Sequence, residues 1–181
     1  MIIRPKTYCV KGTNFVIRSA VQKDAKNLSD VRLQIDGETQ NMDRERGEAF
    51  IDRQNFENLI HHDTENDHNL FLVAVIQDHI VGFSRCEGSE LKRLAHKVEF
   101  GICVLKKYWG LGIGTNLLRE ALHWADANRI KKIALSVLET NDHAIKLYNK
   151  FDFKIEGILK NDKLLSDGKF YHTILMGRFH E

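Results

Sequence analysis

The feature that most constrains this chain is a largely apolar segment, residues 98–105, which leads through a glycine-rich turn into an amphipathic helix. Gly110, Gly112 and Gly114 alternate with other residues in the turn. One side of the helix is apolar and carries Ile113, Leu117, Leu118, Ala121, Leu122 and Ala125. Such a helix start presents unpaired N–H groups at the positive end of the helix dipole, and glycine lets an anion approach the backbone. The segment therefore predicts a site for an anion such as a diphosphate.

The remaining pattern predicts one α/β domain over residues 1–181, because no linker or repeat divides the chain. Strands are expected at 14–18, 70–77, 80–87, 98–105, 132–138, 153–159 and 170–179, and helices at 24–36, 44–61, 113–125 and 141–150. The buried face of the second helix is expected to contain Phe50, Ile51, Leu59 and Ile60. A βαβ unit around the glycine turn with hairpins beside it indicates a mixed (α+β), largely antiparallel twisted sheet with helices on both faces.

Composition and charge exclude several classes of protein. A net charge of +2 over 181 residues gives no indication of a nucleic-acid partner, and no apolar run approaches membrane-helix length. The N-terminus lacks an apolar signal region, and Cys9, Cys86 and Cys103 form no CxxC pair, so we expect a cytoplasmic protein. The polar cluster at 61–68 lacks defined ligand spacing, and we expect no metal.

The identity of the anion follows in part from motifs that the turn does not match. The Walker pattern needs a Lys-Ser/Thr pair, which is missing, and the dinucleotide fingerprint fails because Thr115 stands where its last glycine would be. A nucleotide-binding protein is therefore disfavoured. A strand-to-helix turn with no ligand remains the alternative for this segment taken alone.

The turn resembles the acetyl-CoA signature of the GNAT superfamily of N-acetyltransferases, in which Gln or Arg is followed by two residues, Gly, one residue, and Gly or Ala. Gly112 and Gly114 match, while Trp109 stands where Gln or Arg is usual. The resemblance implies that acetyl-CoA is the acyl donor, and that its pyrophosphate is held by the backbone of Trp109, Gly110, Leu111, Gly112, Ile113, Gly114 and Thr115. It also implies that the pantetheine arm pairs, like an added strand, with backbone groups near Cys103, Val104 and Leu105.

A second segment, residues 133–153, resembles another GNAT pattern through Asn141, Ala144, Leu147, Tyr148 and Phe153, with Asp152 in place of a glycine. Asn141 is expected to contact the cofactor, to cap a helix, or to do both. Tyr148 is either an aromatic packing residue or the general acid that protonates the leaving thiolate. The resemblance covers roughly residues 14–179.

The attacking amine must lose a proton, and Glu99 is the best candidate for the base. Strict alternation places Glu99 on the strand face opposite its apolar neighbours, although a surface or salt-bridged role is equally open. His96 and water are the rival proton acceptors. Residues 36–67 contain ten acidic residues and three arginines, which favours a small cationic amine or a peptide amine as acceptor, unless these charges are only solvated. A non-catalytic acyl-CoA-binding module is the alternative function, and family members are often homodimers.

Overall fold

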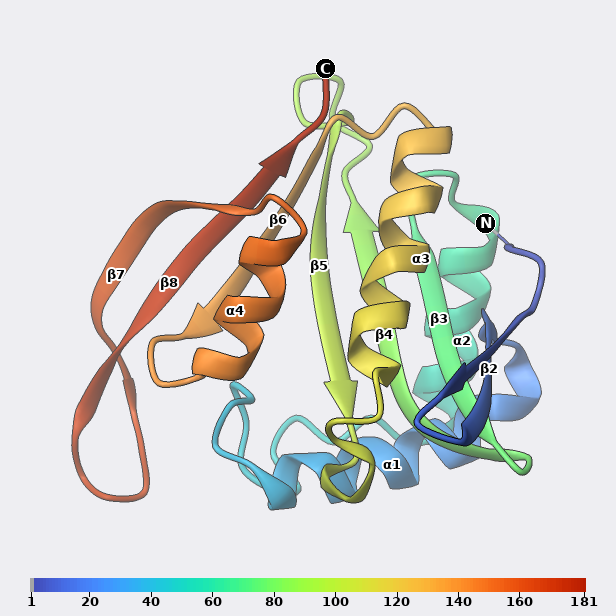
Figure 1. Cartoon of the computed structure of the whole chain (residues 1–181), viewed down its shortest axis with the longest axis horizontal. Helices are drawn as coiled ribbons and strands as arrows, with labels where there is room; N and C mark the ends of the chain where they lie inside the picture. Colours follow the sequence, from blue (N-terminus) through green and yellow to red (C-terminus); the bar gives the residue numbers. More distant parts are fainter. Residues whose placement is uncertain (1) are drawn as a thin grey trace.

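The computed structural model describes residues 2–181, and these residues form one eight-stranded sheet with two helices on each face (Figure 1). The sheet order is β1-β2-β3-β4-β5-β6-β8-β7. The strands are β1 (Lys6–Val10), β2 (Thr13–Ser19), β3 (Leu70–Ile76), β4 (His79–Gly88), β5 (Lys97–Val104), β6 (Lys132–Leu138), β7 (Lys154–Leu164) and β8 (Phe170–Phe179). The helices are α1 (Ala25–Glu38), α2 (Arg53–Glu65), α3 (Ile113–Ala127) and α4 (Asp142–Lys150), with short 3₁₀ turns at Gln22–Asp24 and Lys106–Tyr108.

The β5–β6 pair is the one parallel pair in the described sheet, and it is short. It joins Lys97, Val98 and Glu99 to Lys132, Ile133 and Ala134, after which no further pairing follows although both strands continue. In Figure 1 the two strands separate beyond this point, with the start of α3 and α4 beside the gap. The backbone groups that face the gap therefore lack a partner strand, and this split positions the candidate site.

Two apolar clusters hold the helices to the sheet. Leu117, Leu118 and Ala121 of α3 are fully buried against one face, where Tyr148 and Phe153 also pack. Leu28 and Ile35 of α1 pack with Phe56 and Ile60 of α2 against the opposite face. The mixed, largely antiparallel sheet with helices on both faces confirms the predicted fold class.

The structure corrects the predicted boundaries of the second helix. The helix begins at Arg53 rather than at residue 44, because Asp52 caps it by accepting the N–H of Asn55 at 2.8 Å. Upstream, Gly47 and Ala49 have φ angles of +91° and +42°, which a right-handed helix does not allow. Phe50 is 54% exposed instead of buried. Residues 39–52 therefore form a loop beside the sheet gap.

The first strand, β1, was not expected from the sequence. Its five residues have no clear alternation, and β1 pairs with β2 through a turn at Lys11 and Gly12, whose φ angles are +50° and +77°. This geometry is typical of a two-residue hairpin turn. β7 also extends to Leu164, beyond the predicted end at residue 159.

A buried carboxylate attaches β1 to α3. Glu120 is 3% exposed and accepts hydrogen bonds from the Tyr8 hydroxyl at 2.5 Å and from Lys6 Nζ at 2.7 Å. Burial opposes ionisation of Glu120, but the hydrogen bonds from Lys6 and Tyr8 outweigh it and lower the pKa of the carboxyl group. The ionised form is thus the one that the fold stabilises.

We expect Glu120→Gln to lower the free energy of unfolding at pH 7 by about 1–3 kcal/mol, the range for a broken charged hydrogen bond. A lowered folded pKa stabilises the protein above the unfolded pKa of about 4.3, and this contribution is lost as pH falls through the folded value. Urea titrations at pH 7 and near pH 3 measure the difference between wild type and variant. An equal difference at both pH values would contradict this account.

Candidate functional site

The glycine turn leaves a set of backbone donors without partners at the start of α3. Gly112 is the N-cap in a left-handed conformation, and the first helical hydrogen bond runs from Asn116 N–H to Gly112 O at 3.0 Å. The N–H groups of Ile113, Gly114 and Thr115 precede that bond and have no intrahelical acceptor. Three donors at the positive end of a helix dipole suit an anion.

The three glycines of the turn differ in what a side chain at each position would meet. Gly110 and Gly112 have a φ of +75°, and a Cβ on Gly112 would also lie 3.1 Å from Val10 Cγ1. Gly114 does not have a positive φ, and a Cβ there would meet Ile102 Cδ1 at an ordinary van der Waals distance of 3.6 Å. The fold itself therefore does not require glycine at 114, whereas a ligand lying against this backbone would.

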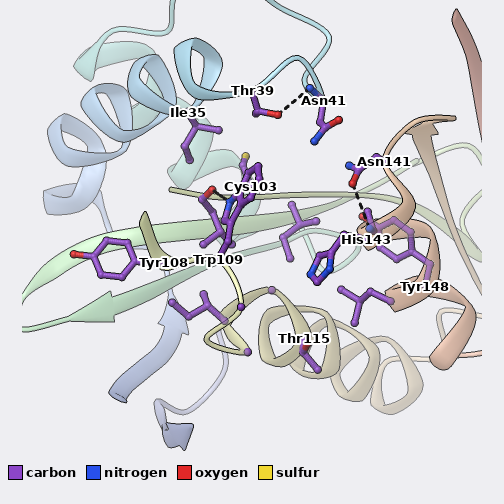
Figure 2. A pocket seen from close by; sticks show the side chains of 18 of the residues that line it. Ile35, Thr39, Asn41, Cys103, Tyr108, Trp109, Thr115, Asn141, His143 and Tyr148 are labelled. Carbon is purple, nitrogen blue, oxygen red and sulfur yellow. Dashed lines mark hydrogen bonds between the residues drawn. The ribbon is translucent and has the colours of Figure 1, made fainter. Parts of the chain in front are cut away.

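A cavity of about 430 Å³ runs along the turn, the end of β5 and the start of α4 (Figure 2). It brings together most of the residues that the sequence singled out for cofactor binding and catalysis. Its lining includes Cys103, Val104, Trp109, Gly110, Gly112, Ile113, Gly114, Thr115, Asn141 and Tyr148. Leu105 and Leu111 lie outside it, since Leu105 is buried in the core of the α1–α2 face and Leu111 packs against the core beneath α3.

The register between β4 and β5 determines which backbone groups of β5 are available to a ligand. Leu105 N–H donates to Val81 O at 2.9 Å, so in this antiparallel ladder Leu105 and Cys103 face β4. Ile102 and Val104 alternate with them and face the gap toward β6. The prediction that Cys103 and Leu105 pair with pantetheine through their backbone is therefore corrected in favour of Ile102 and Val104.

Trp109 has a structural role that the signature did not indicate. Its indole Nε1–H donates to Val104 O at 2.7 Å, and its own backbone N–H donates to Lys106 O at 3.1 Å. The predicted contribution of the Trp109 amide to a pyrophosphate site is corrected, because that amide is already bound. The side chain is 46% exposed and forms part of the cavity wall.

A second cavity of about 320 Å³ opens on the α1–α2 side of the sheet. The residues that line both cavities are Asn41, Met42, Ile102, Cys103, Asn141 and Tyr148. The two spaces therefore meet at the gap between β5 and β6, with Tyr148 of α4 at their junction.

Tyr148 is both a packing residue and a group facing the cavities. Its ring lies 5.7 Å from that of Phe153, and the residue is 6% exposed. The Tyr148 hydroxyl has no hydrogen-bond partner in residues 2–181. It is not among the fully enclosed unpartnered atoms of these residues, which belong to His68 and Thr173, so it is accessible from the cavities. Burial, with a smaller contribution from Cys103, raises the pKa of Tyr148. The hydroxyl therefore keeps its proton at neutral pH.

The second motif also fits its local structure. The Asn141 side chain accepts the N–H of Ala144 at 3.3 Å, which confirms its role as the N-cap of α4 and leaves its amide N–H₂ at the cavity. Asp152 adopts a φ of +65°, the conformation for which glycine is usual at this turn.

The structure does not bring Glu99 into either cavity. Glu99 is exposed on β5, opposite Glu87 of β4, two residues before Gly101, which lines the second cavity. His96 lies before β5 and is exposed, farther from the gap. Neither of the two predicted bases therefore lines a cavity.

Lys11 is a cavity residue that the sequence did not single out. Its Nζ donates to Gly110 O at 2.9 Å, which places an ammonium group beside the anion-binding turn. The Lys11-Gly12 dipeptide, which marks the β1–β2 hairpin, was the available signal.

The acidic residues near the second cavity do not form a free negative rim. Ion pairs join Asp36 to Arg44, Asp43 to Lys163, and Asp63 to Arg85. Within residues 2–181 no group of three or more metal-ligating side chains is arranged to hold an ion. No helix in the same range is long and apolar enough to cross a membrane.

Together, the split parallel pair, the free N–H groups at the start of α3 and the joined cavities define an α/β domain whose sheet gap is suited to a phosphate-bearing ligand. The chain belongs to the acetyltransferase (GNAT) family, whose sequence model matches residues 37–153. It is similar to a crystal structure of a GNAT-family acetyltransferase from Streptococcus pneumoniae, with a TM-score of 0.88, 28% identity, and coverage of 92% of this chain and 99% of that one.

Two curated relatives show partial sequence matches. The L-amino acid N-acetyltransferase AaaT of Escherichia coli is 34% identical over 59% of this chain and 66% of its own length. A probable spermine N(1)-acetyltransferase of Bacillus subtilis subsp. natto is 42% identical over 30% of this chain and 36% of its own length. The matches thus span less than two thirds of either relative, and the relatives differ in the acceptors their names give.

Proposed function

We propose that this chain transfers an acetyl group from acetyl-CoA to a primary amine by direct attack in a ternary complex. The observation that carries the proposal is the meeting of two cavities at Tyr148, in the gap between β5 and β6. One cavity contains the anion-binding turn and would receive the donor. The other lies beyond the gap and would receive the acceptor, so both substrates reach the same hydroxyl.

The residues of the first cavity fit acetyl-CoA. The first-turn N–H groups of α3 and the Lys11 ammonium would hold the diphosphate, and Gly114 leaves room for close approach. Ile102 presents its N–H and C=O to an extended pantetheine arm, and Val104 presents its N–H, since Val104 O already accepts the Trp109 indole N–H. Bound acetyl-CoA supplies the thioester, and these residues fix its position at the gap.

Tyr148 would donate a proton to the departing thiolate. Its raised pKa keeps the hydroxyl protonated, and no described residue accepts a hydrogen bond from it before the reaction. We propose that Glu99 accepts the proton of the amine through water, because Glu99 and the cavity residue Gly101 lie on the same face of β5.

Cys103 lines both cavities, which raises the possibility of an acyl-cysteine route. Burial raises the pKa of the Cys103 thiol to about 12, so the thiolate that such a route needs is scarce at neutral pH. We therefore expect Cys103→Ala to keep kcat within about threefold of wild type, since direct attack does not use the thiol. Steady-state assays measure this, and a loss of about 100-fold or more would favour the covalent route.

The proposed activity is tested by following thiol release from acetyl-CoA while a panel of amines is supplied. Amine-dependent release with formation of the N-acetyl product would support the transferase. Binding of acetyl-CoA without release toward any amine would favour the alternative, a non-catalytic acyl-CoA-binding module.

We also retain a cytoplasmic location and a homodimer as proposals. Cys9, Cys86 and Cys103 are all unpaired, which is typical of a reducing compartment. The edge strand β7 exposes Ile155, Ile158 and Leu164, and exposed apolar groups of this kind are often covered in an assembly. Analytical ultracentrifugation distinguishes a dimer from a monomer.

A further inference from the structure

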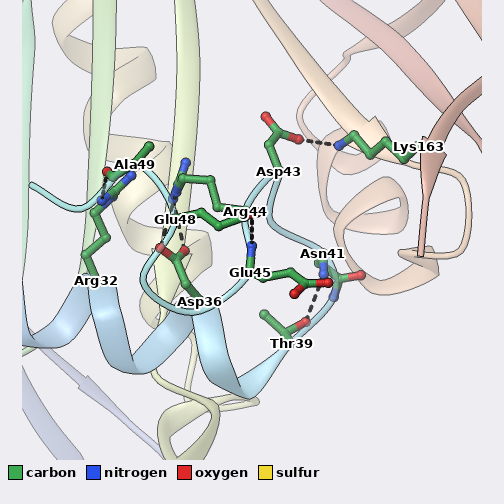
Figure 3. Close-up of polar contacts among 10 residues, drawn as sticks. All are labelled: Arg32, Asp36, Thr39, Asn41, Asp43, Arg44, Glu45, Glu48, Ala49 and Lys163. Carbon is green, nitrogen blue, oxygen red and sulfur yellow. Dashed lines mark hydrogen bonds and ion pairs between the residues drawn. The ribbon is translucent and has the colours of Figure 1, made fainter. Parts of the chain in front are cut away.

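The second cavity is lined by four cationic side chains, of which one stands apart. Arg44, Arg85 and Lys163 each form an ion pair with a carboxylate. Arg32 of α1 lines the same cavity but has no carboxylate within ion-pair distance in residues 2–181. Its single hydrogen bond runs from Nη1 to Ala49 O at 2.7 Å (Figure 3).

Arg32 is 8% exposed, so its guanidinium is largely withdrawn from bulk water. The Arg32 nitrogens that do not bond Ala49 are still accessible from the second cavity, because none of them is a fully enclosed atom without a partner in the described chain. A buried guanidinium without an acid partner is unfavourable, because the one hydrogen bond to Ala49 O replaces only part of the hydration that burial removes. Burial first, and then the neighbouring Arg44, lower the pKa of Arg32 accordingly.

Asp36, one turn along α1 from Arg32, is already occupied. Asp36 accepts Arg44 Nη2–H at 3.0 Å and Arg44 Nε–H at 3.2 Å, so both of its oxygens face Arg44 (Figure 3). The loop 39–52 holds this arrangement, since its Ala49 carbonyl orients Arg32 and its Arg44 engages Asp36. The Arg32 guanidinium nitrogens that do not bond Ala49 are therefore available to a ligand in the second cavity.

We infer that Arg32 forms an anion subsite for the acceptor, and that the acceptor is an amino carboxylate whose amine lies near Tyr148 and whose carboxylate lies on Arg32. This inference rests on the proposed function and narrows its substrate class. A guanidinium pairs well with a carboxylate through parallel N–H donors. A polycation such as spermine offers this cavity no anion and would place further positive charge beside Arg32 and Arg44.

The test compares acceptors that differ in one charge. Amino carboxylates of increasing length, from α-amino acids to 4-aminobutyrate, are each assayed with acetyl-CoA beside their own carboxamides, with spermidine as the polycation. We expect wild type to favour acids over matched amides by about tenfold or more in kcat/KM, the scale of a charged hydrogen bond. Arg32→Gln should remove this preference, whereas Arg53→Gln, which alters an exposed arginine of α2, should preserve it.

The possible outcomes separate the two proposals. Equal turnover of acids and amides, or faster turnover of spermidine, would overturn the anion subsite and leave the acetyltransferase standing. Thiol release that no acceptor increases would overturn both the anion subsite and the proposed acetyltransferase activity. The wild-type comparison decides the matter even where Arg32→Gln fails to fold, because there the charge is removed from the acceptor instead of the protein.

Discussion

Replacing Tyr148 with phenylalanine is expected to lower kcat about 100-fold or more, the lower end of what a general acid contributes. The variant keeps the ring that packs at 5.7 Å against Phe153 and removes only the hydroxyl at the meeting point of the cavities. Because that hydroxyl has no hydrogen-bond partner in the described chain, its loss should leave the fold intact. The dissociation constant of acetyl-CoA should stay within about twofold, since the acid acts on the leaving group and not on the diphosphate.

The matched control is Tyr171→Phe, which removes a tyrosine hydroxyl from β8 that bonds Asp167 at 2.7 Å on an exposed surface. This variant should keep wild-type turnover. Stopped-flow measurement of thiol release, with calorimetric binding of acetyl-CoA, separates chemistry from binding. Unchanged turnover in Tyr148→Phe would remove the acid role and leave Tyr148 as a packing residue alone.

Replacing Gly114 with alanine should separate stability from cofactor binding. An alanine Cβ would meet only Ile102 Cδ1, at 3.6 Å, and alanine is favoured over glycine in a helix by up to about 1 kcal/mol. The same methyl group would project into the cavity beside the first-turn N–H groups of α3. We therefore expect a melting temperature equal to or above that of wild type, together with about 30-fold weaker binding of acetyl-CoA, on the order of 2 kcal/mol.

Gly157→Ala is the matched control, because its Cβ would also meet a single leucine atom, Leu175 Cδ1, at 3.6 Å, on β7 and outside both cavities. This control should bind acetyl-CoA as wild type does. Thermal melts and calorimetric titrations of the three proteins measure both quantities. Wild-type affinity in Gly114→Ala would show that no ligand lies against this part of the turn.

The sequence predicted the fold class because its strongest signals were local. The strand, turn and helix around residues 98–125 and the capped helix at Asn141 depend on spacing and turn chemistry that the structure confirms. β1 was missed because five residues of mixed polarity carry no alternation, and its pairing depends on the Lys11-Gly12 turn and on Glu120 across the chain. The predicted start of the second helix, residue 44, is too early, because positive φ angles such as those of Gly47 and Ala49 leave no trace in the polarity pattern of the sequence.

Only those parts of the candidate site that depend on the spacing of motifs along the chain could be predicted. Motif spacing placed Gly114 and Tyr148 in one cavity, but the orientation of backbone groups on β5 follows from its register with β4, which the sequence does not specify. The lack of an acid partner for Arg32, on which its proposed role rests, could not be predicted either, since it depends on which of two neighbouring arginines Asp36 binds. The net acidity of 36–67 favoured a cationic acceptor, because the ion pairs that neutralise Asp36, Asp43 and Asp63 cannot be seen in the sequence.

The most direct test of the central claim is a calorimetric titration of the wild-type protein with acetyl-CoA, with ATP and NAD as control ligands. The account requires saturable binding of acetyl-CoA, with a stoichiometry of one per chain, and no comparable binding of ATP or NAD. Absence of acetyl-CoA binding, or equal binding of all three ligands, would contradict the assignment of the glycine turn and of the cavity beside it.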